Sequence, residues 1–215
     1  MSQISAVIYD MDGLLLNSEP CWHEAEKVIF RPLGIELTTE MCLQTTGVPV
    51  PEVISYWYEK HPWPNPDFKT VEDALQAEAL KQIKENANLM PGALASLQHF
   101  KSKGLKIGLA SASLLSFIEA VLEKHHIGSY FDFYHSAALE EKSKPDPAVY
   151  LTVARTLGVP IETCFIMEDS KLGVQGAKKS GAVVCAIPSE HDFNHPAFDI
   201  ADYKVNTLNE AIGLV

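Results

Sequence analysis

Four short, almost continuously apolar segments constrain the fold of this 215-residue chain most strongly. They are residues 6–9, 106–110, 164–167 and 183–187. Strands that are buried on both faces of a parallel sheet have this pattern. Between the later segments, apolar residues recur at helical spacing, so strands and helices alternate from about residue 90 to the end. This alternation predicts an α/β domain with right-handed crossovers.

Polar residues mark where several of the expected helices begin. Ser113, Asp146 and Ser170 each precede an apolar periodic stretch, and we expect them to act as N-caps. Pro147, directly after Asp146, suits the first position of a helix. Gly181 is expected to end the helix that follows Ser170, because glycine readily adopts the left-handed conformation found at helix ends.

The stretch that follows the first strand has a different character. It contains no convincing strand, it holds all three tryptophans, and its apolar residues recur at helical spacing. Proline-rich breaks at residues 49–51 and 62–66 separate the expected helices. We therefore expect residues 17–85 to form a small helical domain, inserted into an α/β core made of residues 1–16 and 86–215.

Composition narrows the class of protein. Asp and Glu outnumber Lys and Arg 28 to 17, which gives a net charge of −11. A nucleic-acid binder or a protein that docks on anionic membranes would need a basic face. A small anionic substrate is still compatible with this charge, because one site can be locally positive.

Other features favour a cytoplasmic protein. The chain has no apolar run long enough to span a membrane, and its first residues lack the basic start and apolar run of a signal peptide. The four cysteines show no C-x-x-C spacing, which indicates a reducing compartment. We expect a cytoplasmic monomer with neither nucleic acid nor a membrane as partner.

A pair of carboxylates ends the first expected strand. Asp10 and Asp12 are two residues apart, so their side chains should point to the same side, and Gly13 allows a sharp turn. Ligands of open α/β sheets bind at this end of the strands. Paired carboxylates suit a metal ion, or a nucleophile with an acid or base beside it. Taken alone, the same pair could equally be surface or capping acids.

Three further polar groups follow the pattern. Ser111 and Ser113 come at the end of the second strand, where hydroxyls and free N–H groups can bind an anion. Lys144 precedes a helix and could offer its charge to a phosphate. Glu168 and Asp169 end another strand and suit a hard cation such as Mg²⁺. Each has an ordinary alternative as a cap or surface residue, but four strands ending in such groups would supply all the parts of phosphoryl transfer.

These motifs resemble those of the haloacid dehalogenase superfamily, in the branch that has a helical cap after the first strand. The match covers essentially the whole chain and rests on four motifs in the family's order. They are Asp10-Met11-Asp12-Gly13, Leu109-Ala110-Ser111-Ala112-Ser113, Ser143-Lys144-Pro145 and Glu168-Asp169-Ser170. The resemblance implies a Rossmann-like, doubly wound parallel sheet with an inserted helical cap domain. Within the family, the chain is most similar to bacterial sugar-phosphate phosphatases of the 2-deoxyglucose-6-phosphatase or hexitol phosphatase kind.

The resemblance implies a mechanism and a set of site residues. Asp10 would form an aspartyl-phosphate, and Asp12 would act as general acid and then as general base. Mg²⁺ would be held by Asp10, the Asp12 backbone carbonyl, Asp169 and Glu168, the last as a ligand or as support. The remaining residues would bind the phosphoryl group or offset its charge. They are Ser111, Ala112, Ser113 and Lys144.

Substrate choice is expected in the cap, around Trp22 and Gly47. Trp22 either stacks against a sugar or belongs to the core of the cap helices. In the related β-phosphoglucomutases, a histidine and an arginine hold a second phosphate, and those positions look like Trp22 and Val50 here. Asn17 stands where relatives usually have Asp, from which we expect a hinge effect rather than lost chemistry.

The expected activity is therefore Mg²⁺-dependent hydrolysis of a small phosphate monoester, such as 2-deoxyglucose 6-phosphate or a hexitol phosphate. The alternatives are a phosphosugar mutase of the β-phosphoglucomutase type and another phosphatase of the family, acting on phosphoglycolate or a nucleotide-related ester. Outside the family, a signalling receiver domain would place its acid on a later strand, and an idle binding module would not need the full set of acids and Lys144.

Overall fold

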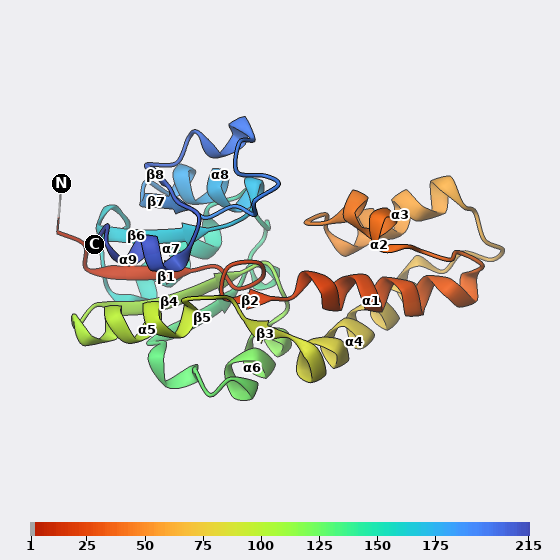
Figure 1. Ribbon diagram of the computed structural model, residues 1–215, viewed down its shortest axis with the longest axis horizontal. Helices are drawn as coiled ribbons and strands as arrows, with labels where there is room; N and C mark the ends of the chain where they lie inside the picture. The colour runs from red at the N-terminus through yellow and green to blue at the C-terminus, as the bar shows by residue number, and fades with distance from the viewer. Residues whose placement is uncertain (1–2) are drawn as a thin grey trace. The chain divides into compact units, whose positions relative to one another are not determined.

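The computed structural model describes residues 3–215. The expected absence of a signal peptide concerns the first residues of the sequence, and residues 1–2 lie outside the described range. The chain divides into two compact units (Figure 1). The larger comprises Met1–Asn17 and Leu89–Val215, and the smaller comprises Ser18–Asn88. Within the described residues, no helix is both long and apolar enough to cross a membrane.

The larger unit is built on a six-stranded sheet. Its strand order is β5-β4-β1-β6-β7-β8, and every neighbouring pair is parallel. The strands are β1 (Ala6–Tyr9), β4 (Lys106–Ser111), β5 (Phe133–Ser136), β6 (Cys164–Glu168), β7 (Val183–Ala186) and β8 (Tyr203–Lys204). This arrangement confirms the predicted α/β class and the parallel sheet.

Helices lie on both faces of this sheet (Figure 1). They are α5 (Ala93–Ser102), α6 (Leu115–Lys124), α7 (Ala148–Leu157), α8 (Lys171–Ser180) and α9 (Leu208–Ile212). The helices α7 and α8 bury their apolar sides against one face, where Ile8 and Ile166 are fully buried. On the opposite face, the Tyr9 hydroxyl lies 2.6 Å from Oγ of Ser96 on α5.

Two of the predicted caps form as expected. The Ser170 hydroxyl accepts the backbone N–H of Gly173 at 3.0 Å, and Gly181 ends α8 in the left-handed conformation. The helix α7 begins at Ala148, two residues after the expected cap, yet Asp146 Oδ1 still accepts the N–H of Ala148. The prediction that Ser113 caps α6 is wrong, because that helix has Leu114 at its N-cap and no side-chain cap bond.

The smaller unit is helical, with α1 (Glu19–Phe30), α2 (Thr39–Cys42), α3 (Val50–Lys60) and α4 (Phe68–Asn86). Both α1 and α3 pack against α4, and Phe30 and Trp57 are buried between the helices. The helix α3 starts inside a proline-rich stretch that the sequence suggested as a break. Pro51 fits there because the first turn of a helix leaves its N–H groups unbonded.

Two short strands lie where the chain passes between the units. They are β2 (Leu16–Asn17) and β3 (Asn88–Leu89), and they form a separate two-stranded sheet. The backbone N–H of Met90 also donates to the carbonyl of Leu15 at 2.8 Å. The chain therefore leaves the larger unit and returns to it along neighbouring backbone segments.

Candidate active site

Three acidic residues gather where β1 and β6 end. The two strands are parallel neighbours, and Tyr9 is paired with Met167. The next residues along the chain are Asp10 and Glu168, respectively, and Asp169 follows Glu168. One carboxylate oxygen from each of the three acids lies within 4.8 Å of the other two. The parallel pairing thus brings together acids that are far apart in the sequence, as the strand-end pattern predicted.

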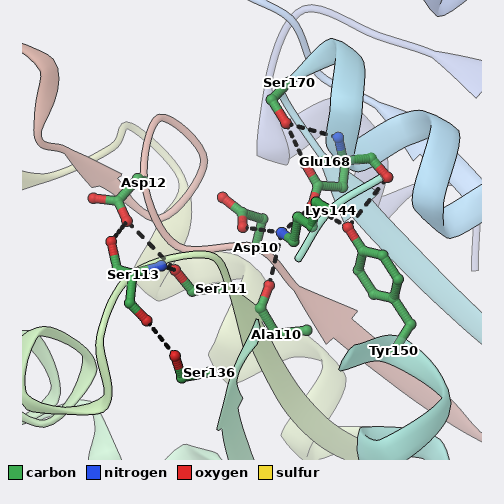
Figure 2. A network of polar contacts seen from close by, with 11 residues as sticks. Asp10, Asp12, Ala110, Ser111, Ser113, Ser136, Lys144, Tyr150, Glu168 and Ser170 are labelled. Atoms are coloured by element: carbon green, nitrogen blue, oxygen red, sulfur yellow. Dashed lines mark hydrogen bonds and ion pairs between the residues drawn. The ribbon is translucent and has the colours of Figure 1, made fainter. Parts of the chain in front are cut away.

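Lys144 lies between two of these acids. Its Nζ is 2.5 Å from Asp10 Oδ1, 2.5 Å from Glu168 Oε1 and 3.0 Å from the Ala110 carbonyl oxygen (Figure 2). Its side chain is only 6% exposed, and the Glu168 side chain is fully buried. One sequence prediction needs correction, because Lys144 does not end a strand. It lies in the segment that joins β5 to α7.

The electrostatics of this group follow from burial and crowding. Burial raises the pKa of Asp10 to about 8, and the charge of Glu168 adds to this rise while Lys144 opposes it. Burial, followed by the charges of Asp10 and Glu168, also raises the pKa of Asp169 well above its usual range. For Lys144, burial lowers the pKa, but the two acids beside it raise the value well above the usual range. Lys144 thus contacts two of the three clustered carboxylates, and a further cation would stabilise the cluster when its acids are ionised.

The residues of this acidic cluster are suited to bind a hard metal ion. Asp169 Oδ1 is buried and has no hydrogen-bond partner among the described residues. Carboxylate oxygens are the ligands that Mg²⁺ and similar cations prefer. Gly13 gives Asp169 its space, since a Cβ at Gly13 would lie 2.0 Å from Asp169 Oδ2. The cluster of Asp10, Glu168 and Asp169 can therefore hold a metal ion.

The second acid of the first motif has different partners. Asp12 Oδ2 accepts a hydrogen bond from Ser113 Oγ at 2.6 Å and a longer one from Ser111 Oγ at 3.4 Å (Figure 2). The Ser111 hydroxyl also accepts the backbone N–H of Ser113 at 3.0 Å. Asp12 Oδ1 is buried without a partner in the described part of the chain. The hydroxyl predicted to cap α6 thus binds Asp12 instead.

The loop after β4 is held by a hydrogen bond from the end of the neighbouring strand, β5. The Ser136 hydroxyl, at the end of β5, donates to the Ser113 carbonyl oxygen at 2.6 Å and accepts the N–H of Ala138. Ala112, the middle residue of the loop, is exposed. The loop is therefore held by its backbone, while Ala112 stays accessible to solvent.

Sequence reasoning missed one residue of the network. Tyr150, on α7, is fully buried and its hydroxyl lies 2.5 Å from Glu168 Oε1. In the sequence it occupies an apolar position of the α7 pattern, so nothing there distinguishes it from a core residue. The sequence predicts Ser170 as a cap and as part of a family motif, and its hydroxyl also lies 3.2 Å from Glu168 Oε2.

The two residues predicted to select the substrate lie in the smaller unit. Trp22 is half-buried on α1, and Gly47 is exposed with a φ of 75°. His23, next to Trp22, is buried, and its Nε2 lies 3.2 Å from Oγ1 of Thr46, next to Gly47. The structure thus links the segments around Trp22 and Gly47 by hydrogen bonds of Thr46 to α1 within this unit.

Comparison with known proteins places this site in context. Residues 7–187 match the family described as haloacid dehalogenase-like hydrolase. The chain is 37% identical to hexitol phosphatase B of Escherichia coli K12, over 97% of this chain and 94% of that protein. It is 32% identical to the phosphorylated carbohydrates phosphatase of Thermotoga maritima, over 83% of this chain and 82% of that protein.

Solved structures resemble it over nearly its whole length. A putative β-phosphoglucomutase from Thermotoga maritima is 26% identical and gives a TM-score of 0.82, with 98% of each chain covered. A predicted phosphoglycolate phosphatase from Haemophilus somnus gives a TM-score of 0.87 at 16% identity, covering 100% of this chain and 99% of that one. At that identity, the second likeness concerns the fold alone.

Proposed function

The chain belongs to the haloacid dehalogenase-like hydrolase family, and from this premise we propose that it is a Mg²⁺-dependent phosphatase that acts through an aspartyl-phosphate on Asp10. Its substrate in this proposal is a small sugar phosphate, such as a hexitol phosphate or 2-deoxyglucose 6-phosphate. The names of the two phosphatases that are more than 30% identical support this class of substrate. The observation that carries the proposal is the contact of Asp10 with buried Lys144 inside a cluster of acids.

Asp10 is the residue suited to attack phosphorus. Lys144 Nζ contacts its Oδ1 at 2.5 Å, which fixes one carboxylate oxygen and leaves Oδ2 as the nucleophile. The lysine charge also offsets the repulsion between this carboxylate and an anionic phosphate. Ser111 and the N–H of Ala112 would bind the phosphoryl oxygens, and the exposure of Ala112 supports access from solvent.

Asp12 is the residue suited to move protons. A sugar alkoxide is a poor leaving group, and a positioned acid typically accelerates its departure by about 10²–10⁴-fold. Asp12 would protonate that oxygen as the bond to phosphorus breaks. It would then accept a proton from the water that hydrolyses the aspartyl-phosphate. The contact with Ser113 holds the Asp12 carboxylate in one orientation before substrate arrives.

Mg²⁺ would be held by Asp10 and Asp169, with the Asp12 backbone carbonyl and with Glu168 as a further ligand or as support. The unpartnered Asp169 Oδ1 supports this assignment. When bound, the ion supplies positive charge that neutralises the phosphate and the crowded carboxylates. Glu168 is already engaged by Lys144 and Tyr150, which favours its supporting role.

Further proposals concern substrate choice and location. In this proposal, Trp22 and Gly47 contact the leaving group of the substrate. Trp22 and Val50, in the same unit, stand where β-phosphoglucomutases have the residues that hold a second phosphate. The four cysteines are buried and show no C-x-x-C spacing, which supports a reducing compartment, the cytoplasm.

The test is a panel of phosphate monoesters incubated with the purified protein and Mg²⁺, with release of inorganic phosphate as the readout. The panel holds hexitol and hexose phosphates, 2-deoxyglucose 6-phosphate, pentose phosphates, nucleoside monophosphates and phosphoglycolate. Release that disappears with EDTA and in Asp10→Asn supports the proposal. Release from none of them contradicts it, and isomerisation of a sugar phosphate in the presence of a sugar bisphosphate would favour the mutase instead.

A further inference from the structure

Tyr150 touches both partners of a buried ion pair. Its hydroxyl lies 2.5 Å from Glu168 Oε1 and 3.1 Å from the Gly173 carbonyl oxygen. Lys144 Nζ contacts the same Glu168 oxygen, and it also lies 5.2 Å from the centroid of the Tyr150 ring (Figure 2). The ring face is attractive to a cation, so Tyr150 stabilises Lys144 directly as well as through Glu168.

The packing of α8 holds this tyrosine and this glutamate in place. A Cβ at Gly173 would lie 2.0 Å from Glu168 Oε2, and a Cβ at Gly176 would lie 3.2 Å from Cε2 of Tyr150. The two glycines are three residues apart and therefore lie on one face of the helix. The missing side chains let α8 approach closely enough to leave Tyr150 and Glu168 almost no freedom.

The Glu168 carboxylate is shared among three donor side chains. Lys144 and Tyr150 contact Oε1, and Ser170 contacts Oε2 at 3.2 Å. Without the tyrosine hydroxyl, Oε1 would be held by Lys144 alone and Oε2 by Ser170, so the carboxylate would be held less firmly. Lys144 would then be placed less firmly between Glu168 and Asp10, because one of its two anionic partners would have lost a contact.

We propose that Tyr150 is a positioning residue that holds Lys144 against Asp10 by fixing Glu168. The residue cannot itself touch a substrate that enters from solvent, since it is fully buried. Its effect on the reaction, which rests on the proposed function, is therefore transmitted through the pair of Lys144 and Glu168 to the nucleophile.

The first test compares the kinetics of Tyr150→Phe with those of a matched control, Tyr9→Phe. Tyr9 is also fully buried in the larger unit, and its hydroxyl also contacts a buried side chain, that of Ser96 on the opposite face of the sheet. We expect kcat to fall about tenfold in Tyr150→Phe, as for a lost charge-assisted hydrogen bond. KM should stay within about twofold, because substrate binding is not altered. Thermal unfolding of both variants establishes that each is folded.

The second test does not depend on turnover. Lysines are methylated by formaldehyde and a mild reductant without denaturation, and the modification of Lys144 is followed by peptide mass spectrometry, with exposed Lys142 as the internal reference. We expect Lys144 to react faster in Tyr150→Phe than in the wild type, and at the wild-type rate in Tyr9→Phe. This expectation holds even if the protein hydrolyses no phosphate ester, so failure of the proposed function would be recognised separately.

Two results would overturn the inference. Unchanged labelling of Lys144 in folded Tyr150→Phe would show that the tyrosine does not restrain the lysine. In an active enzyme, faster labelling with an unchanged kcat would show that this restraint does not serve the reaction. A fall in kcat accompanied by faster labelling, with neither change in Tyr9→Phe, supports it.

Discussion

The Ser113 hydroxyl lies 2.6 Å from Asp12 Oδ2, whereas Asp10, two residues earlier, is held by Lys144. The two acids of one short motif thus have partners of different chemistry, a neutral donor for Asp12 and a cation for Asp10. When two neighbouring carboxyl groups have different surroundings, they can take different roles in one reaction. The predictions below start from this division.

Replacing Ser113 with Ala should impair proton transfer more than bond formation at phosphorus. Loss of the hydroxyl leaves Asp12 with the longer contact to Ser111 alone. We expect the rate of aspartyl-phosphate formation from a sugar phosphate to fall about tenfold. With p-nitrophenyl phosphate, whose leaving group departs without a proton, the rate of this first step should change little. The measurement is the single-turnover rate of alcohol release from both esters, with Ser116→Ala, an exposed position on α6, as the control. Equal losses of this rate with the two esters would argue against an acid role for Asp12.

Replacing Lys144 with Met should damage both stability and activity. The change leaves Asp10 and Glu168 buried without their cation, and removal of one partner from such a pair typically costs about 3–5 kcal/mol. The deficit should shrink as the pH falls, because protonation of Asp10 removes uncompensated charge. Urea unfolding at several pH values measures this, and exposed Lys142→Met should behave like the wild type. A Lys144→Met protein as stable and active as the wild type would contradict the site described here.

Replacing Asp169 with Asn should weaken metal binding. One carboxylate oxygen of Asp169 is buried without a partner, and the amide removes the charge that attracts a cation. EDTA should abolish hydrolysis by the wild type, and Mg²⁺ should restore it. In Asp169→Asn, the Mg²⁺ concentration that gives half-maximal activity should rise by about tenfold or more. Calorimetric titration with Mg²⁺ provides the same comparison without turnover. Identical Mg²⁺ affinity in the two proteins would exclude Asp169 as a ligand.

Glu26 should make the smaller unit less stable as the pH rises. Burial raises its pKa from 4.5 to about 7, with Thr45 Oγ1 3.4 Å from Oε2. Between these values the folded state binds the proton more tightly than the unfolded state, so the free energy of unfolding falls as the pH increases through this window. Glu26→Gln removes the effect. We expect this variant to exceed the wild type in stability by about 1–3 kcal/mol near pH 8, and to match it near pH 5.

Tryptophan fluorescence during urea unfolding measures this prediction directly. All three tryptophans lie within Ser18–Asn88, so the signal reports on the smaller unit. The control is Glu59→Gln, an exposed position on α3, which should not alter the pH dependence. If Glu26→Gln were instead less stable than the wild type near pH 8, the buried carboxyl would have to be ionised and paired.

Much of the larger unit could be predicted because its strands are buried on both faces. The segments that form β1, β4, β6 and β7 are nearly continuous apolar runs. Short runs of this kind are typical of strands that are covered by helices on both faces of a parallel sheet. The edge strand β5 could not be found this way. Its residues are mostly half-buried, and its sequence includes Tyr134 and His135. A strand at the edge of a sheet needs no continuous apolar run.

The residues of the candidate site were recognised by their chemical type, but their partners were not. The sequence marked Asp10 and Lys144 as groups with a function, and parallel strand pairing explains why such groups meet. The roles of Tyr150 and Ser113 depend on which hydroxyl reaches which carboxylate, and this is decided by tertiary packing. Burial of Glu26 likewise results from the packing of α1 among the other helices of its unit, and the residue type gives no sign of it.

The central claim is that phosphate ester hydrolysis proceeds through a covalent phosphoryl group on Asp10. The most direct measurement is rapid acid quenching of the enzyme during turnover of the best ester, followed by peptide mass spectrometry. Borohydride treatment of a parallel sample would reduce an aspartyl-phosphate to homoserine. We predict a phosphorylated peptide containing Asp10 and homoserine at that position in the wild type, with neither in Asp10→Asn. Steady turnover without any phosphoryl group on this peptide, together with retained activity in Asp10→Asn, would contradict the account.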